Sequence, residues 1–173
     1  MKQIKKIGFG GGCHWCTEAV FLSLKGVEEV VQGWIASVGE KDTFSEAVIV
    51  YYNPKQISLE VLLEIHLRTH KSTLSHTMRE KYRSAVYYFN EFDREVIQQI
   101  LQQLQKKFEE KIITEVLSFA EFKPSREEIV NYYYKNPQKP FCENFINPKL
   151  KLLLKEYNLY AKTEQLKHLQ RKN

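Results

Sequence analysis

A short apolar segment that runs into three consecutive glycines and then a cysteine constrains this chain most strongly. Residues 4–9 predict a short strand, and glycines 10–12 end it in a tight turn, because glycine adopts unusual backbone dihedrals at little cost. Behind this turn, apolar side chains at helical spacing predict a helix over residues 15–24, which ends at Lys25-Gly26. The sequence therefore predicts a strand, a glycine turn and a helix whose first residues present Cys13.

The rest of the chain alternates between segments typical of strands and of helices. β-Branched and aromatic runs predict strands over residues 27–36, 46–52, 82–89 and 112–119. Apolar stripes of helical period predict helices over residues 59–69, with Ser58 as N-cap, over 92–108 and over 125–134. This order predicts an α+β fold, a two-layer sandwich of the ferredoxin-like type with a mixed β-sheet, packed helices and a long irregular C-terminal segment.

The positive charge of the chain is concentrated near its C-terminus. The net charge is +5, and residues 149–173, with seven basic and two acidic side chains, carry all of it. We expect one main domain over residues 1–148 and a basic, Leu- and Lys-rich, helical tail over residues 149–173. Because the main domain is neutral, the charge does not indicate nucleic-acid binding.

Three further expectations concern the environment of the chain. The apolar stretches are too short for a signal peptide or a membrane span, so we expect a cytoplasmic protein that binds no membrane. Three cysteines are too few for a disulfide-stapled secreted scaffold, and in a reducing compartment a cysteine cluster is more often catalytic or metal-binding. We also expect a monomer.

Cys13 has the sequence position of a reactive thiol. At the start of a helix, unpaired backbone N–H groups and the positive end of the helix dipole stabilise a thiolate, which is the nucleophilic form. Three alternatives remain open. Cys13 could be a small buried residue; it could bind a metal with His14 and Cys16, although companion ligands are missing; or Cys13 and Cys16 could form a thioredoxin-type pair, although the surrounding domain order differs.

Several motifs, taken in order, resemble one family. The segment from Gly11 to Glu18, which reads Gly-Gly-Cys-His-Trp-Cys-Thr-Glu, resembles the Gly-Cys-Phe-Trp signature of the peptide methionine sulfoxide reductase A family. Later motifs of that family are similar to Gln32-Gly33-Trp34, Ser45-Glu46-Ala47-Val48, Tyr51-Tyr52-Asn53-Pro54, His70-Lys71-Ser72-Thr73, Lys81-Tyr82-Arg83-Ser84, Lys135-Asn136-Pro137 and Pro148-Lys149-Leu150. The resemblance covers about residues 4–150.

The resemblance implies a thiol-dependent reduction of methionine S-sulfoxide, free or in proteins. Cys13 would attack the sulfoxide sulfur and become a sulfenic acid, and Trp15 would wall the pocket for the substrate methyl group. Glu46 and Tyr82 would hydrogen-bond the sulfoxide oxygen and help to protonate it. Taken singly, each of these side chains also fits an ordinary structural role, and the family order is what favours the catalytic one.

The resemblance also implies a resolving cysteine and an external reductant. Cys142 is similar to the family's C-terminal recycling cysteine, whereas Cys16 lies one helical turn from Cys13; which of them resolves Cys13 stays open. Thioredoxin or another dithiol would reduce the resulting disulfide, and no bound cofactor or metal is expected.

The chain departs from the family pattern at several positions. His14 replaces a Phe of the methyl pocket, Trp34 replaces a Tyr that donates to the sulfoxide oxygen, and Ile129 replaces a His. The segment between His70 and Tyr82 is shorter than in the family. Two other functions therefore remain open: a degenerate member that is weakly active or only binds, and a general dithiol oxidoreductase that uses Cys13 and Cys16.

Overall fold

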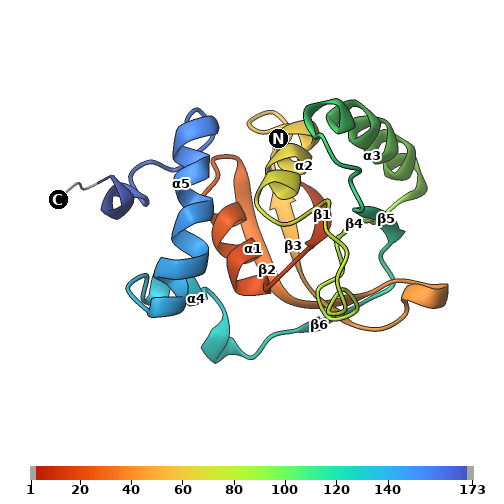
Figure 1. Cartoon of the computed structure of the whole chain (residues 1–173), viewed down its shortest axis with the longest axis horizontal. Coiled ribbons are helices and arrows are strands. Elements are labelled where there is room, and N and C mark those ends of the chain that lie inside the picture. The colour runs from red at the N-terminus through yellow and green to blue at the C-terminus, as the bar shows by residue number, and fades with distance from the viewer. Residues whose placement is uncertain (1–2, 171–173) are drawn as a thin grey trace.

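The computed structural model describes residues 3–170, which form a six-stranded sheet with helices packed against it (Figure 1). The strands are β1 Lys5–Gly10, β2 Val27–Ala36, β3 Ser45–Tyr52, β4 Ala85–Tyr88, β5 Glu115–Ser118 and β6 Glu121–Pro124. Their order in the sheet is β5-β4-β1-β3-β2-β6, and every neighbouring pair is antiparallel except the parallel pair β4 and β5. The predicted mixed sheet is confirmed, and its four central strands have the ferredoxin-like order.

The helices of the described chain cover one face of this sheet. They are α1 His14–Leu22, α2 Leu59–Arg68, α3 Glu91–Leu104, α4 Tyr132–Lys135 and α5 Asn147–Glu156. Along β3, Val48 and Val50 point into the main core with the helices, whereas Ala47 and Ile49 belong to a smaller apolar cluster on the opposite face. This alternation is the two-residue period of a strand, and it confirms the predicted two-layer α+β arrangement.

Local signals determine where the central helices begin. The Ser58 hydroxyl accepts a hydrogen bond from the Val61 backbone N–H at 3.2 Å, which confirms Ser58 as the N-cap of α2. The Asn90 side chain caps α3 in the same way, through the Asp93 N–H at 3.0 Å. Helix α3 ends at Leu104 and continues as a 3-10 turn to Lys107, close to the predicted end at residue 108.

Three elements differ from the sequence-based expectation. Only the second half of the predicted strand 82–89 forms β4, because the backbone of residues 81–83 is instead bonded to the start of β3. The predicted helix 125–134 is interrupted at Asn131, whose φ of 57° is left-handed, so it becomes the 3-10 turn Glu127–Ile129 and the short helix α4. Strand β6 was not expected: it is a four-residue edge strand without a sequence pattern, and pairing with β2 creates it.

The C-terminal segment packs onto the same core as the rest of the chain. Helix α5 begins at Asn147, so the expected boundary between residues 148 and 149 falls in its first turn. Leu150, Leu153 and Leu166 are fully buried in the main core, and α5 lies beside α1 (Figure 1). The basic residues at positions 171 and 172 of the expected tail lie outside the described residues.

None of the helices between residues 3 and 170 is both long and apolar enough to cross a lipid bilayer.

Candidate active site

Cys13 is the N-cap of helix α1, three residues after the end of the central strand β1. Its backbone carbonyl accepts hydrogen bonds from the N–H groups of Cys16 at 3.1 Å and Thr17 at 3.3 Å, which start the helix. The side chain is partly exposed and unpaired in any disulfide. The predicted position of Cys13, at the junction of a strand, a glycine turn and a helix, is confirmed.

The surroundings of the Cys13 sulfur favour a thiolate. A hydrogen bond from the Cys16 thiol, together with the backbone N–H groups of Trp15 and Cys16, lowers the pKa of Cys13 below its ordinary value. Burial and the charge of Glu46 act in the opposite direction without cancelling this effect. Cys13 is therefore the thiol that ionises first, since the hydrogen bond to Cys13 and burial raise the pKa of Cys16 far above its ordinary value.

The third cysteine lies deeper in the protein. Cys142 is in a π-helical turn, Cys142–Ile146, that leads into α5, and its side chain is fully buried. Burial raises the pKa of its thiol. Its charge state also affects Cys16, so the three sulfur atoms occupy one region of the molecule.

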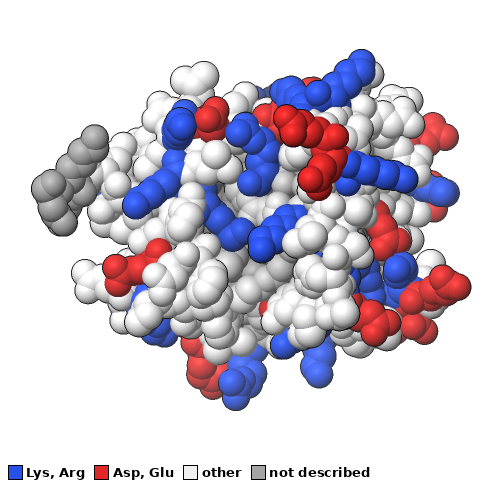
Figure 2. All heavy atoms as spheres, viewed as in Figure 1, with Lys and Arg blue, Asp and Glu red and all other residues white. Residues whose placement is uncertain are grey.

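A cavity of about 590 Å³ opens beside Cys13 and Cys16. Four segments enclose it: the glycine turn, residues 69–82, the turn around Phe141 and the start of α5, which contributes Lys149. Figure 2 shows Lys and Arg side chains around a hollow in the middle of the face that carries α1 and α5. The Lys149 ammonium donates a hydrogen bond to the Thr69 carbonyl, and its charge interacts with both Cys13 and Cys16. A substrate can therefore reach the thiol from a cavity with cationic walls.

The buried side chains of Glu46 and His14 form a cluster with the partly buried Trp34 next to Cys13. Glu46, the second residue of β3, lies directly across from Trp34 on β2. One of its carboxylate oxygens accepts a hydrogen bond from the His14 backbone N–H at 3.1 Å. The His14 ring donates from Nδ1 to the Gly33 carbonyl at 2.8 Å and packs its edge against Trp34, with ring centres 5.0 Å apart.

The protonation of His14 follows from these contacts. Burial lowers the pKa of His14, which keeps the ring neutral near pH 7. Because Nδ1 faces a carbonyl and carries the proton, Nε2 presents a lone pair to a Glu46 oxygen 3.5 Å away. A neutral imidazole in this place adds no positive charge beside the Glu46 carboxyl group.

Tyr82 is brought to the same edge of the sheet by its neighbours in the chain. The Glu46 N–H donates to the Lys81 carbonyl at 2.9 Å, and the Ser45 hydroxyl bridges the Lys81 carbonyl at 3.0 Å and the Arg83 N–H at 2.8 Å. Tyr82 lines the cavity with Cys13, and the Lys81 ammonium lies 5.1 Å from the centre of its ring and 3.9 Å from Glu46. The structure thus brings Cys13, Glu46 and Tyr82 together.

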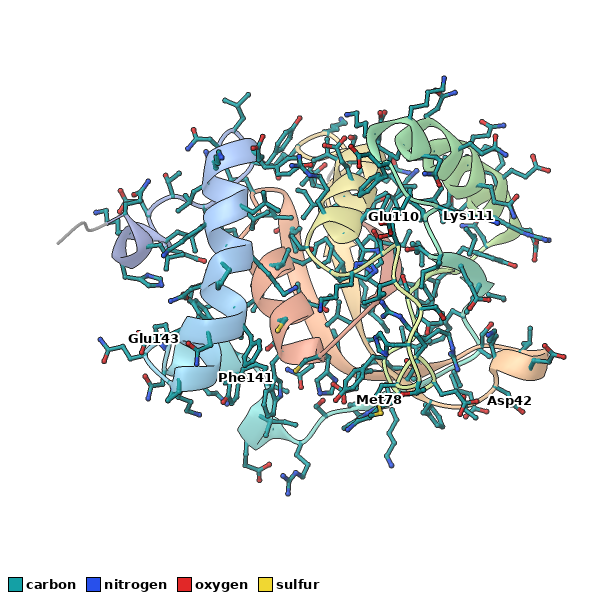
Figure 3. The ribbon with its side chains drawn as sticks, viewed as in Figure 1. Asp42, Met78, Glu110, Lys111, Phe141 and Glu143 are labelled. Carbon is teal, nitrogen blue, oxygen red and sulfur yellow. The ribbon has the colours of Figure 1, made fainter. Side chains whose placement is uncertain are left out.

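Trp15 is part of an aromatic cluster rather than a direct wall of the cavity. Its ring stacks on Tyr132 with centres 4.0 Å apart, and Phe141 meets it edge-on at 5.5 Å. Phe141 borders the cavity and lies beside the first turn of α1 (Figure 3). Trp15 and Tyr132 pack against the Phe141 ring and do not themselves line the cavity. Glu18 holds this cluster in place by accepting hydrogen bonds from the backbone N–H groups of Asn131 at 2.9 Å and Tyr132 at 3.3 Å.

Several residues of the site were not expected from the sequence: Arg79, Lys81, Tyr132, Phe141 and the ammonium of Lys149. Lys81 and Phe141 are chain neighbours of Tyr82 and Cys142, which is the one local signal that could have indicated them. Within residues 3–170, no three His, Cys, Asp or Glu side chains are placed to hold a metal ion together.

Comparisons with known proteins agree with one family. A family model described as "Peptide methionine sulfoxide reductase" matches residues 5–162. The chain is 32% identical over 172 residues to the peptide methionine sulfoxide reductase MsrA of Acinetobacter baumannii (strain SDF), covering 91% of this chain and 95% of that one.

Two solved structures are similar as well. The reduced form of Mxr1 from Saccharomyces cerevisiae is 28% identical, has a TM-score of 0.70 and covers 81% of this chain and 90% of its own. Mxr1 in complex with Trx2 is 25% identical, has a TM-score of 0.60 and covers 75% of this chain and 85% of its own.

Proposed function

The chain belongs to the peptide methionine sulfoxide reductase family, and on this premise we propose that Cys13 is the nucleophile with which it reduces methionine sulfoxide. The observation that carries this assignment is the lowered pKa of the Cys13 thiol at the start of α1, beside Glu46 and Tyr82. We further propose that the substrate is the S epimer, free or within a protein, as the family resemblance implies.

In the first step the Cys13 thiolate attacks the sulfur atom of the sulfoxide. The oxygen atom is transferred: the sulfur–oxygen bond of the substrate breaks and a bond between this oxygen and the Cys13 sulfur forms. The methionine sulfur is reduced by two electrons, and Cys13 is oxidised by two electrons to a sulfenic acid. The oxygen needs a proton as the bond to Cys13 forms. Glu46 supplies it and Tyr82 donates a second hydrogen bond, while the neutral His14 ring adds no second positive charge to that of the Lys81 ammonium beside Glu46.

The methyl group of the substrate lies against the aromatic cluster. Phe141 offers an apolar edge within the cavity, and Trp15 and Tyr132 stabilise its position. Trp34 lies across from Glu46 on the neighbouring strand and is not among the residues that line the cavity. A polar S=O group is thus held by donors while the methyl group meets aromatic carbon, which orients the sulfur toward Cys13.

Cys16 then resolves the sulfenic acid. Its thiol already donates a hydrogen bond to the Cys13 sulfur, whereas Cys142 is fully buried. Attack of the Cys16 sulfur forms a Cys13–Cys16 disulfide and releases the Cys13 hydroxyl as water, with the proton coming from the Cys16 thiol. The nearby Lys149 ammonium stabilises the developing Cys16 thiolate, and Cys142 can exchange into this disulfide in a second step.

The reductant that returns the enzyme to its dithiol form is a thioredoxin-like protein or another dithiol. Support comes from the resemblance to the family and from the similarity to Mxr1, whose structure has been solved in complex with Trx2. We propose that no bound cofactor or metal is needed, and that the protein works as a monomer in the cytoplasm.

Single-turnover chemistry tests the assignment. Reduced wild-type protein mixed with one equivalent of methionine S-sulfoxide should release about one methionine per active site, and mass spectrometry of the sample quenched after this first turnover should find the Cys13–Cys16 disulfide. Cys13→Ser should release none. Retained turnover in Cys13→Ser would refute the nucleophile, and a Cys13–Cys142 disulfide without the Cys16 pairing would refute Cys16 as the resolver.

Glu46→Gln separates this function from general disulfide reduction. Loss of a proton donor costs about 10²- to 10⁴-fold, so sulfoxide reduction should slow by that order. Reduction of insulin disulfides uses Cys13 and Cys16 alone and should not depend on Glu46. If the variant loses neither activity, the acidic role of Glu46 is wrong; if wild type reduces only insulin, the protein is a dithiol oxidoreductase.

A further inference from the structure

The loop that carries Tyr82 contains no helix or strand of its own, and β3 holds only its last part, at residues 81–83. Residues 69–84 form successive turns between α2 and β4, yet this segment must place the Tyr82 hydroxyl against a substrate bound at Cys13. An irregular segment beside an active site stays ordered when side chains bond its backbone carbonyls. In this loop the side chain of Arg79 bonds the backbone carbonyls of three residues.

Arg79 uses every N–H group of its guanidinium for this purpose. Nη1 donates to the carbonyls of Gly11 at 3.2 Å and Tyr82 at 2.9 Å. Nε donates to Leu74 at 3.1 Å, and Nη2 donates to Leu74 at 2.9 Å and Lys71 at 2.5 Å. Five donors thus meet four backbone carbonyls, which is the full capacity of an arginine side chain.

One of these carbonyls belongs to a different part of the site. Lys71, Leu74 and Tyr82 lie in the loop itself, whereas Gly11 lies in the glycine turn two residues before Cys13. The same nitrogen, Nη1, bonds Gly11 and Tyr82, so a single atom joins the segment of the nucleophile to that of the oxygen-binding tyrosine. Among residues 3–170, no carboxylate lies within ion-pair distance of this guanidinium.

We propose that Arg79 is a positioning residue that sets the placement of Tyr82 relative to Cys13. This inference rests on the proposed role of Tyr82 in the reaction. Arg79 also lines the cavity beside Cys13, but its guanidinium N–H groups are all bonded to backbone carbonyls, so it acts through the backbone. A lysine cannot replace it, because an ammonium has three donors on one atom and cannot span the four carbonyls.

The first test compares Arg79→Lys and Arg79→Gln with Arg94→Lys, an exposed arginine on α3 far from the site. Because a displacement of about 1 Å at a reacting centre can cost up to about 10²-fold, we expect both Arg79 variants to lose on the order of tenfold or more in kcat. The rate of Cys13 alkylation by iodoacetamide at pH 7 should stay within about twofold, since the thiol keeps its own hydrogen bonds. Arg94→Lys should match wild type in both measurements.

The second test is a double-mutant cycle with Tyr82→Phe. If Arg79 acts by placing the Tyr82 hydroxyl, Arg79→Lys should reduce kcat by less than about twofold once that hydroxyl is gone. Independent, multiplicative losses would overturn the proposal while leaving the role of Tyr82 intact. No loss in Tyr82→Phe alone would overturn both.

Two further outcomes also count against Arg79 as a positioning residue. Full activity in Arg79→Lys would mean that a positive charge suffices. Failure of both Arg79 variants to fold, judged by circular dichroism against Arg94→Lys, would mean that the guanidinium supports the whole domain rather than the geometry of Tyr82.

Discussion

At the scale of single residues, the proposed chemistry depends on the hydrogen bonds that the Cys13 sulfur accepts. The start of α1 supplies two backbone N–H groups, and the Cys16 thiol supplies a third donor, which is the strongest influence on Cys13. The same contact makes Cys16 hard to ionise. One hydrogen bond therefore makes Cys13 the thiol that ionises first, which agrees with the proposed roles of Cys13 as nucleophile and Cys16 as resolving cysteine.

Removing that donor should raise the pKa of Cys13. We expect Cys16→Ala to shift the pH midpoint of Cys13 alkylation upward, toward that of an ordinary thiol, because two donors cannot stabilise the thiolate as well as three. Cys16→Ser keeps a hydroxyl donor and should shift it less. Peptide mapping of iodoacetamide adducts between pH 5 and 10 measures both midpoints, and identical profiles for the two variants would contradict this account.

At the scale of elements, the site is assembled from segments that bind one another through backbone groups. Ser45 and Glu46 at the start of β3 hold residues 81–83, and Glu18 on α1 holds the Asn131–Tyr132 backbone. Glu18 is almost fully buried, and burial raises its pKa. Its role is to fasten the aromatic cluster to the helix that begins with Cys13.

Loss of the Glu18 carboxylate should therefore weaken the fold as well as the site. In Glu18→Ala, three donors lose their acceptor, namely the backbone N–H groups of Asn131 and Tyr132 and the side-chain amide of Gln32, which we expect to cost about 2–3 kcal/mol of unfolding free energy. Glu18→Gln retains one carbonyl oxygen and should lose less. Urea unfolding measures the difference, with the exposed Glu95→Ala on α3 as a control that should change by under about 0.5 kcal/mol. Equal stability of Glu18→Ala and Glu95→Ala would refute this role.

At the scale of the whole molecule, the sheet order makes the site possible. β1 lies between β3 and β4 in the sheet. The same end of the sheet therefore holds the last residues of β1 before Cys13, the start of β3 at Glu46 and the segment after Tyr82 that enters β4. Helix α2 is joined to this edge by His66, which is fully buried and donates from Nε2 to the Gly10 carbonyl at 2.8 Å. This hydrogen bond joins the helix layer to the end of the sheet at which Cys13 lies.

His66 should make the domain sensitive to acid. Burial lowers its pKa to about 4, below the value of about 6.5 in an unfolded chain. Between these values the unfolded state binds the proton first, so stability falls as the pH drops from about 6.5 to 4, by up to about 3 kcal/mol from this residue. Urea unfolding at pH 7.5 and 4.5 should show a smaller loss for His66→Gln than for wild type. An equal loss in both proteins would exclude His66 as the cause.

Local sequence was sufficient for most of the elements and for the position of Cys13 at the start of a helix. Alternating and helical periods predicted the central strands and helices, and the glycine turn before Cys13 predicted a cysteine at a helix start. These features depend on backbone dihedrals and side-chain period over a few residues, which the sequence specifies directly. Strand β6 and the break at Asn131 were missed because pairing with β2 and the hydrogen bonds to Glu18 decide them.

The sequence by itself determined the α+β order, the family and the likeness of Cys13, Glu46 and Tyr82 to a set of reacting groups. The tertiary structure alone decided that the Cys16 thiol contacts the Cys13 sulfur and that Cys142 is buried. It also decided that Phe141 lies between Trp15 and the cavity, and that Arg79 joins the glycine turn to the loop that carries Tyr82. The reason is physical: these contacts connect residues that lie far apart in the chain, or orient side chains within one turn. Sheet register and packing fix them, and neither is encoded in short-range spacing.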